Sequence, residues 1–200
     1  MKIFIIILLL IFTSYSADFA SSSLIKKVEK KYNRFAKNRF VALNRLLKRL
    51  QKSSTKKKLE RVNEFFNFVK YKSDKEVYGI SDYWASPSEF LARDKGDCED
   101  YVIAKYFALK NLGIPTSKMF LTYVRVAGLK DAHMVLSYFE TPNSEPLILD
   151  SIRRIIFPAS KRTDLTPVYN FNPNILRNGK RTSAHKKWDV LLRKIKRNKI

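Results

Sequence analysis

The apolar pattern of this chain changes its period once, and that change limits the fold more than any other feature. Upstream of Gly113 the apolar residues recur at helical spacing, whereas residues 119–126 and 132–139 alternate as strands. Gly113-Ile114-Pro115 marks the change, with glycine just past a last helical turn and proline beyond it. Helices followed by a strand meander predict an α+β fold.

The helical half predicts several separate helices. The expected helical segments are residues 23–50, a second helix from Thr55, a short helix from Ser86-Pro87 through Leu91, and a strong helix over 98–112. Ser86, Pro87 and Glu89 form a helix-start signal, with a serine cap, a proline at the first helical position and an acid in the first turn. Residues 74–85 are expected to form a loop, and residues 95–97 a turn.

The second half predicts a small sheet. Strands are expected over residues 119–126, 132–139 and 146–150. Beyond Pro158 the chain is rich in turn residues, so we expect little regular structure except a short strand at residues 168–171. Residues 186–200 are expected to form either a basic helix or a frayed tail.

Residues 1–16 have the features of a cleavable signal peptide. Lys2 gives a short positive start, residues 3–12 are an unbroken apolar run, and Ser14-Tyr15-Ser16 offers the small residues that a signal peptidase reads. We therefore expect an exported protein whose mature chain begins near Ala17. The apolar run is short for a bilayer span, and an uncleaved anchor is the alternative.

Basic charge is concentrated near the two ends of the chain. The formal net charge is +22, residues 26–61 hold 15 Lys and Arg against 2 Glu, and residues 176–200 hold 10 against one Asp. Such runs are typical of solvated helix faces, and contact with an anionic membrane or an acidic partner is the alternative. Export and the absence of a readout motif argue against binding to nucleic acid.

Cys98 is the only cysteine, so no disulfide can form within the chain. It stands in Gly96-Asp97-Cys98-Glu99-Asp100, at the start of the predicted helix. Unpaired amides and the helix dipole favour an anion there, which would lower the thiol pKa, and the same amides can receive an oxyanion. Gly96 is expected to let the backbone approach a substrate. The three neighbouring acids oppose ionisation of the thiol unless a cation neutralises them.

His133 and Asp150 are the candidate partners of the thiol. His133 lies in one predicted strand, and Asp150 ends the next one. Taken singly, each is more often a structural residue. Together with Cys98 they can form a nucleophile, a base and a residue that orients the base. Adjacent strands lie about 5 Å apart, so the carboxylate can reach the imidazole. Asp164 and Asn170 are the alternatives for orienting His133.

These residues carry a resemblance to a known family. The stretches Trp84-Ala85-Ser86-Pro87-Ser88-Glu89-Phe90-Leu91, Gly96-Asp97-Cys98-Glu99-Asp100-Tyr101, Ala132-His133-Met134-Val135-Leu136 and Leu149-Asp150 resemble the bacterial transglutaminase-like cysteine proteinases, and among them the LapG-type periplasmic proteases. The resemblance covers roughly residues 55–157 and implies a papain/transglutaminase-like fold. The expected organisation is a signal peptide (1–16), a basic helical extension (17–54), a protease domain (55–175) and a basic tail (176–200).

The resemblance also implies an activity and a site. It makes Cys98 the nucleophile, His133 the base and Asp150 its orienting residue, and it assigns Asp97 and Glu99 to a Ca²⁺ ion, with Asp100 as a further candidate. Calcium would also relieve the carboxylate repulsion at the thiol. The implied function is a calcium-dependent periplasmic endopeptidase that releases a large surface adhesin and so controls biofilm attachment. The implied regulatory partner is an inner-membrane cyclic-di-GMP receptor that sequesters the protease.

Two other functions are compatible with the same residues. The first is a transglutaminase, because a thioester on Cys98 can pass its acyl group to an amine as well as to water. The second is a non-enzymatic basic module that binds a membrane or a polyanion. Incorporation of an amine would identify the first, and a thiol that resists alkylation would favour the second.

Overall fold

The computed structural model describes residues 18–129, 132–175, 181–197 and 200. The predicted signal peptide therefore lies outside the described residues. Within the described part, no helix has the length and apolar character needed to cross a membrane.

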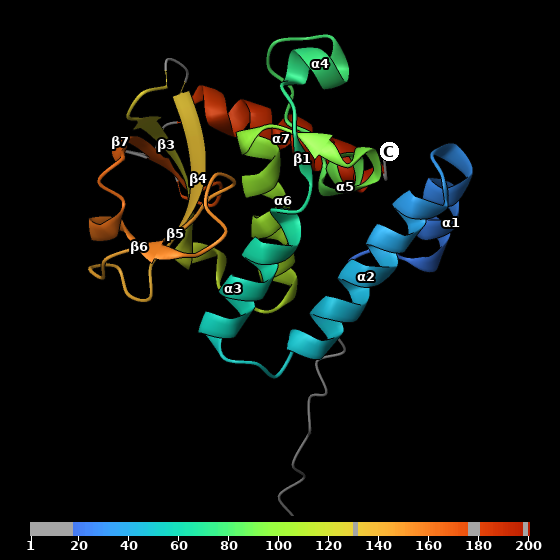
Figure 1. Ribbon diagram of the computed structural model, residues 1–200, viewed down its shortest axis with the longest axis horizontal. Coiled ribbons are helices and arrows are strands. Elements are labelled where there is room, and N and C mark those ends of the chain that lie inside the picture. Colours follow the sequence, from blue (N-terminus) through green and yellow to red (C-terminus); the bar gives the residue numbers. More distant parts are fainter. Residues whose placement is uncertain (1–17, 130–131, 176–180, 198–199) are drawn as a thin grey trace, which may run out of the picture.

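Five of the strands form one antiparallel sheet in the order β6-β5-β4-β3-β7. Their bounds are β3 Met119–Val126, β4 Ala132–Tyr138, β5 Leu147–Leu149, β6 Phe157–Pro158 and β7 Leu165–Phe171. The helices stand to one side of this sheet (Figure 1). The α+β class and the papain/transglutaminase-like architecture expected from the sequence are confirmed.

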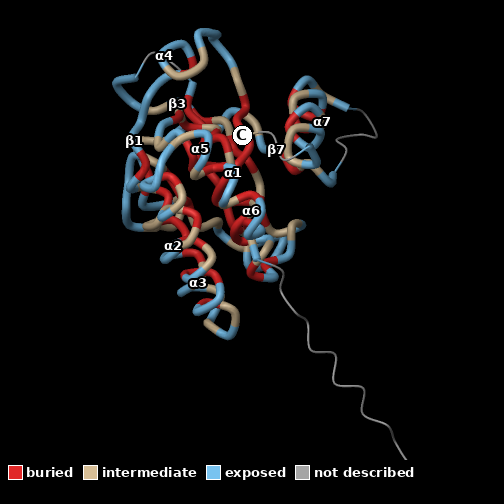
Figure 2. Tube along the Cα trace, turned by 90° about the vertical axis from the view of Figure 1, so that its right-hand side faces the viewer, coloured by how far each residue is buried: buried red, intermediate tan, exposed pale blue. Residues whose placement is uncertain are grey.

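Helix α6 (Cys98–Asn111) occupies the centre of the molecule. It contacts β4 and β3 of the sheet on one side, and α3 (Thr55–Phe66) and α5 (Pro87–Arg93) on the other. Its buried residues surround the helix axis instead of forming one stripe, as expected for a helix enclosed by protein. Figure 2 shows the buried trace gathered around α6 and the neighbouring sheet. The first residue of this enclosed helix, Cys98, is thereby fixed beside the sheet.

The expected single helix over residues 23–50 is wrong, because the chain forms two helices. α1 covers Ser22–Lys31 and α2 covers Arg34–Leu50. Asn33 causes the break: its side chain accepts a hydrogen bond from the Ala36 amide at 2.8 Å and starts a new helix. Phe35, which would share an apolar face with Val28 in one continuous helix, is 75% exposed after this restart. α2 packs against α5.

Three expectations about irregular segments are also corrected. Residues 74–85 contain a short helix, α4 (Asp74–Tyr78), because Ser73 and Glu76 form a capping box. The strand expected at residues 168–171 is longer, since β7 pairs with β3 along its length. The turn expected at residues 95–97 contains β2 (Lys95–Gly96), which pairs in parallel with β1 (Lys70–Tyr71).

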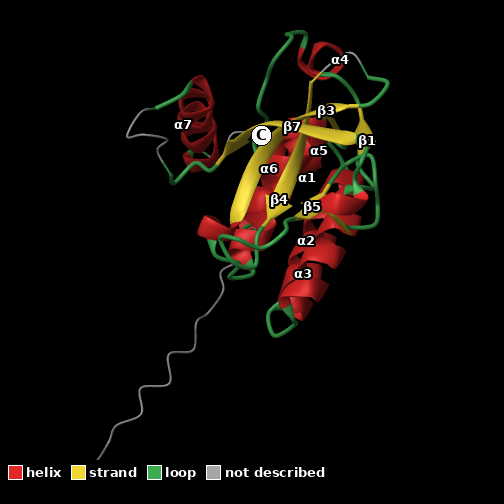
Figure 3. Ribbon diagram, turned by 90° about the vertical axis from the view of Figure 1, so that its left-hand side faces the viewer, coloured by secondary structure: helices red, strands yellow, loops and turns green. Residues whose placement is uncertain are grey.

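The C-terminal basic segment is a docked helix, α7 (Ser183–Lys196). It stands beside β7 (Figure 3). Trp188 is 5% exposed and makes ring contacts with four aromatic side chains from three other segments: Trp84, Tyr106, Phe107 and Phe171. This aromatic cluster is the reason that a strongly basic segment folds back onto the domain.

Gly96 is required by packing next to the thiol. A Cβ at this position would lie 2.4 Å from the Asp100 carboxylate oxygen Oδ2 and 2.6 Å from the Phe90 ring. Both neighbours are buried and sit on helices α6 and α5. Close approach of Asp100 and Phe90 therefore explains the glycine by packing, and the expected close approach of a substrate stays a prediction.

We expect Gly96→Ala to lower the free energy of unfolding by about 1–3 kcal/mol, because overpacking displaces the Phe90 ring or the Asp100 carboxylate. Urea unfolding followed by circular dichroism measures this loss. Lys56→Ala, at an exposed position of α3, is the control. A Gly96→Ala variant as stable as the wild type would contradict the packing argument.

Candidate active site

Cys98 lies at the first position of α6, against the beginning of β4. Its side chain is 8% exposed. The thiol donates a hydrogen bond to Glu99 Oε2 at 3.2 Å, and the backbone amide of Met134 in β4 donates to the sulfur. Met134 directly follows His133, so the thiol lies next to the strand position that carries the candidate base.

His133 and Asp150 are in direct contact, as expected. Leu149 pairs with Leu136 in the antiparallel register of β4 and β5, so Asp150 lies diagonally across from His133. The His133 Nε2 atom is 2.7 Å from Asp150 Oδ1, and both side chains are almost fully buried. Because Asp150 engages Nε2, Nδ1 is the ring nitrogen that can serve as a base for the thiol.

The Asp150 carboxylate is held by two further groups. Arg162 Nη2 donates to Asp150 Oδ2 at 2.8 Å, and the Ile152 amide donates to Oδ1 at 3.1 Å. Burial alone raises the pKa of Asp150, but the hydrogen bonds from His133, Ile152 and Arg162 and the His133 charge outweigh it and lower the pKa to about 2. Asp150 is therefore an anion at neutral pH.

Arg162 was not identified from the sequence. It follows a 3-10 helix, η2 (Ala159–Lys161), and is 3% exposed. It also binds Asp164 through two hydrogen bonds, of 2.9 and 2.8 Å. Asp164, considered as an alternative partner of His133, instead pairs with Arg162. An arginine among many in a basic chain gives no signal of this role.

The backbone carbonyl of Asp150 also accepts two hydrogen bonds from side chains. Asn67, at the end of α3, donates to that oxygen at 2.8 Å, and the fully buried Lys105 of α6 donates to it at 3.1 Å. Neither residue was identified from the sequence. In the sequence, Lys105 is a polar residue within a largely apolar helix, and only the tertiary structure shows what it contacts.

The thiol pKa differs from the expectation for a helix N-terminus. Burial raises the pKa of Cys98 well above its ordinary value, and Glu99 and Asp97 raise it further. The hydrogen bond from the Met134 amide lowers it only in part. The repulsion expected from the flanking acids is thus present and, together with burial, outweighs the favourable contact with the Met134 amide.

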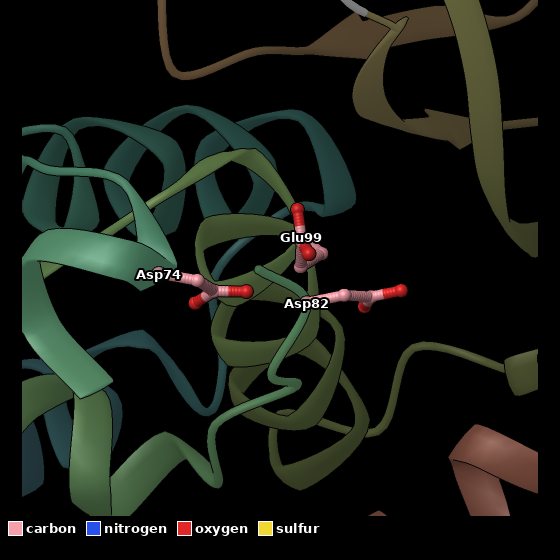
Figure 4. Close-up of side chains that lie close together, drawn as sticks. All are labelled: Asp74, Asp82 and Glu99. Carbon is pink, nitrogen blue, oxygen red and sulfur yellow. The ribbon is translucent and has the colours of Figure 1, made fainter. Parts of the chain in front are cut away.

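Acidic side chains from three segments meet beside Cys98. Asp74, Asp82 and Glu99 each place one carboxylate oxygen within 4.8 Å of the others, and Asp74, Asp97 and Asp100 do the same. Figure 4 shows Asp74 on α4, Asp82 on the following loop and Glu99 on α6. The sequence pointed to the acids beside Cys98 but not to Asp74 or Asp82.

Only the tertiary structure brings the segment that carries Asp74 and Asp82 to the start of α6. The parallel pairing of β1 with β2 continues in a hydrogen bond from the Lys72 amide to the Gly96 carbonyl, at 2.9 Å. The Asp74 amide then donates to Asp97 Oδ2 at 3.2 Å. This contact between segments more than twenty residues apart brings α4 to the start of α6.

The acidic cluster fits a hard divalent cation. Among the described residues, three buried carboxylate oxygens in it have no hydrogen-bond partner: Asp74 Oδ1, Asp97 Oδ1 and Asp100 Oδ2. Burial and mutual repulsion raise the pKa of Asp74 to about 6, that of Asp97 to about 7, and that of Asp100 well above its ordinary value. Unsatisfied buried anions are costly, and a cation with oxygen ligands would satisfy them.

The buried amine of Lys105 makes the free energy of unfolding depend on pH. Burial lowers its pKa from 10.5 to about 7, with Asp150 opposing the shift. Between these pH values the unfolded chain binds more protons at this residue, so its contribution to the free energy of unfolding rises with pH. The slope is at most about 1.4 kcal/mol per pH unit.

We therefore expect the stability advantage of Lys105→Met over the wild type to be largest near pH 7 and to shrink toward about pH 9. Urea unfolding of both proteins across this pH range measures the difference between their free energies of unfolding. The other titrating groups contribute equally to both proteins, so they cancel in this difference. A difference independent of pH would contradict the lowered pKa of Lys105.

Comparison with known proteins identifies the family. Residues 30–168 match the sequence profile of the family described as bacterial transglutaminase-like cysteine proteinase BTLCP. A comparison with curated proteins found no significant match.

Solved structures of Legionella pneumophila LapG are similar over nearly their whole length. One shares 41% sequence identity at a TM-score of 0.76, covering 89% of this chain and 99% of its own. The calcium-bound form gives 42% identity and a TM-score of 0.74, covering 88% and 99%. The EGTA-treated form gives 40% identity and a TM-score of 0.75, covering 89% of this chain and 99% of its own. With the thiol, the imidazole–carboxylate pair and this family match together, the chain belongs to the bacterial transglutaminase-like cysteine proteinases.

Proposed function

We propose that this cysteine protease is a calcium-dependent periplasmic endopeptidase that cleaves a large surface adhesin near its N-terminus. The observation that carries the catalytic part is the arrangement of Cys98, His133 and Asp150. The thiol begins α6, which packs on β4, and the Met134 amide next to His133 acts on the thiol to lower its pKa. The His133 ring is hydrogen-bonded to Asp150 at 2.7 Å.

Each residue of this set has a proposed role. Cys98 is the nucleophile that attacks the peptide carbonyl, and His133 Nδ1 accepts its proton and later passes it to the leaving amine. Asp150 holds the ring through Nε2 and stabilises the imidazolium. Arg162 keeps Asp150 ionised and oriented. Backbone amides at the beginning of α6 are suited to receive the oxyanion.

Calcium is the proposed cation of the acidic cluster. A calcium-bound form and an EGTA-treated form of L. pneumophila LapG are among the similar structures, and the oxygen-only donor set here suits the same ion. Asp74, Asp97 and Asp100 would supply buried ligands, and Glu99 and Asp82 would complete the site. When bound, the ion would supply positive charge that offsets the repulsion between Glu99, Asp97 and a Cys98 thiolate.

The substrate and the setting of the reaction are also proposals. The signal-like residues 1–16 support export to the periplasm, where a surface adhesin is within reach. The likeness to LapG supports an adhesin as substrate, a role in biofilm release, and control by an inner-membrane cyclic-di-GMP receptor. Incubation with the N-terminal region of a giant adhesin from the same genome tests the substrate directly.

We expect Cys98→Ala to abolish cleavage and His133→Ala to be about as damaging, because members of a catalytic set act as a unit. Asp150→Asn should lower kcat by about 10⁴-fold, since it removes the charge that stabilises the imidazolium. The readout is cleavage of the adhesin fragment by gel electrophoresis. Circular dichroism must show that each variant is folded. Full activity of folded Cys98→Ala would refute the mechanism.

A transglutaminase reaction is tested in the same mixture. Dansylcadaverine, a fluorescent primary amine, is added to the cleavage assay. Fragments without fluorescence support hydrolysis, whereas fluorescent uncleaved adhesin would favour acyl transfer to amines.

We expect EGTA to suppress cleavage and added Ca²⁺ to restore it better than Mg²⁺, whose small octahedral shell fits this cluster less well. Calorimetric titration of the EGTA-treated, dialysed protein should show calcium binding, weakened at least about tenfold in Asp97→Asn and Asp74→Asn, which each remove one anionic ligand. Glu60→Ala, an exposed acid on α3, is the matched control. No heat of binding at millimolar calcium, with EGTA-resistant cleavage, would contradict the proposal.

A further inference from the structure

Lys105 is a buried amine that the reaction itself does not use. It lies seven residues after Cys98 on α6, which is two helical turns, so the two side chains share one face of the helix. Its side chain is fully buried, and Nζ donates a hydrogen bond to the Asp150 backbone carbonyl at 3.1 Å. One helix face thus carries both the thiol and a contact to the residue that orients the base.

Stability does not explain a lysine at this position. Enclosing an amine in a protein interior is costly, and replacement of a buried charge by an apolar side chain of similar volume is often neutral or stabilising. The Asp150 carbonyl does not depend on Lys105 for its hydrogen bond, because Asn67 donates to the same oxygen at 2.8 Å. The contact must therefore serve something other than satisfying that carbonyl.

The contacts of Asp150 indicate what the lysine does. Arg162 reaches Asp150 from the segment after η2, and Asn67 reaches it from the end of α3. Lys105 ties Asp150 to α6 itself, the helix that begins with Cys98. Since the His133 ring is bonded to the Asp150 carboxylate at 2.7 Å, a shift of Asp150 relative to α6 moves the imidazole relative to the thiol.

We infer that Lys105 is a positioning residue, which sets the placement of the His133 imidazole against the Cys98 thiol by fixing Asp150 to the nucleophile helix. The inference rests on the proposed roles of these three residues. It requires no contact between Lys105 and the substrate. Displacement of a reacting group by about 1 Å can cost 10²-fold in rate, so a contact remote from the peptide bond can matter.

The test compares two uncharged replacements of equal length, Lys105→Met and Lys105→Gln. Methionine lacks a donor, whereas the glutamine amide can still donate toward the Asp150 carbonyl. Lys110→Met, at an exposed position of the same helix, is the matched control. With an adhesin fragment as substrate, we expect Lys105→Met to lower kcat by about 10- to 100-fold with KM unchanged. Lys105→Gln should recover part of this loss.

Two further measurements separate positioning from a structural role. The Tm of Lys105→Met should equal or exceed that of the wild type, because a buried amine has been removed. The low-field proton resonance of the His133–Asp150 hydrogen bond should shift or broaden in Lys105→Met and return in Lys105→Gln. Unchanged kcat and an unchanged resonance in Lys105→Met would overturn the inference. Equal losses in both variants, together with a lower Tm, would assign Lys105 to stability and overturn it as well.

The rate of Cys98 alkylation by iodoacetamide tests the positioning role without the adhesin substrate. Slower alkylation in Lys105→Met than in Lys110→Met is expected, because the imidazole is displaced from the thiol. If the wild type cleaves no adhesin but alkylation slows and the resonance changes, the proposed substrate fails and the positioning role stands. If the wild type cleaves and Lys105→Met matches it in both cleavage and alkylation, the positioning role fails and the proposed function stands.

Discussion

The near-complete burial of α6 is the constraint from which the rest of the structure follows. An apolar helix without a polar face must be enclosed, and here the sheet encloses it on one side and α3 and α5 on the other. The helix start is thereby held against β4, where Cys98 meets the Met134 amide beside His133. The position of the thiol is a consequence of core packing, and loops contribute little to it.

The same burial creates an electrostatic problem at the start of α6. Asp97 and Asp100 lie close to Asp74, and buried carboxylate oxygens of all three lack hydrogen-bond partners. Their raised pKa values and that of the Cys98 thiol have the same two causes, burial and like charge. Bound positive charge at this one place would therefore stabilise the fold and a thiolate together, which couples metal binding to catalysis in the proposed enzyme.

Asp150 has the opposite environment, although it is equally buried. Arg162, the Ile152 amide and His133 all donate to its carboxylate, and these contacts keep its pKa at about 2. Asn67 and Lys105 hold its carbonyl. A fixed anion beside the imidazole and an acidic cluster beside the thiol thus give the two ends of the site different electrostatics. Burial raises the pKa of the acids at both ends, and only Asp150 has donors that reverse the shift.

Local sequence signals determined individual helices and strands of this protein. Ser86 with Glu89 fixed the start of α5, Gly113 ended α6, and alternation placed β3 at its observed bounds, because each signal acts within a few residues. The contact of His133 with Asp150 also followed from the order of the strands. Only the tertiary structure brought Asp74, Lys105 and Arg162 to the site, since each arrives through a pairing or packing contact between segments distant in sequence. Short-range propensity carries no information about such contacts.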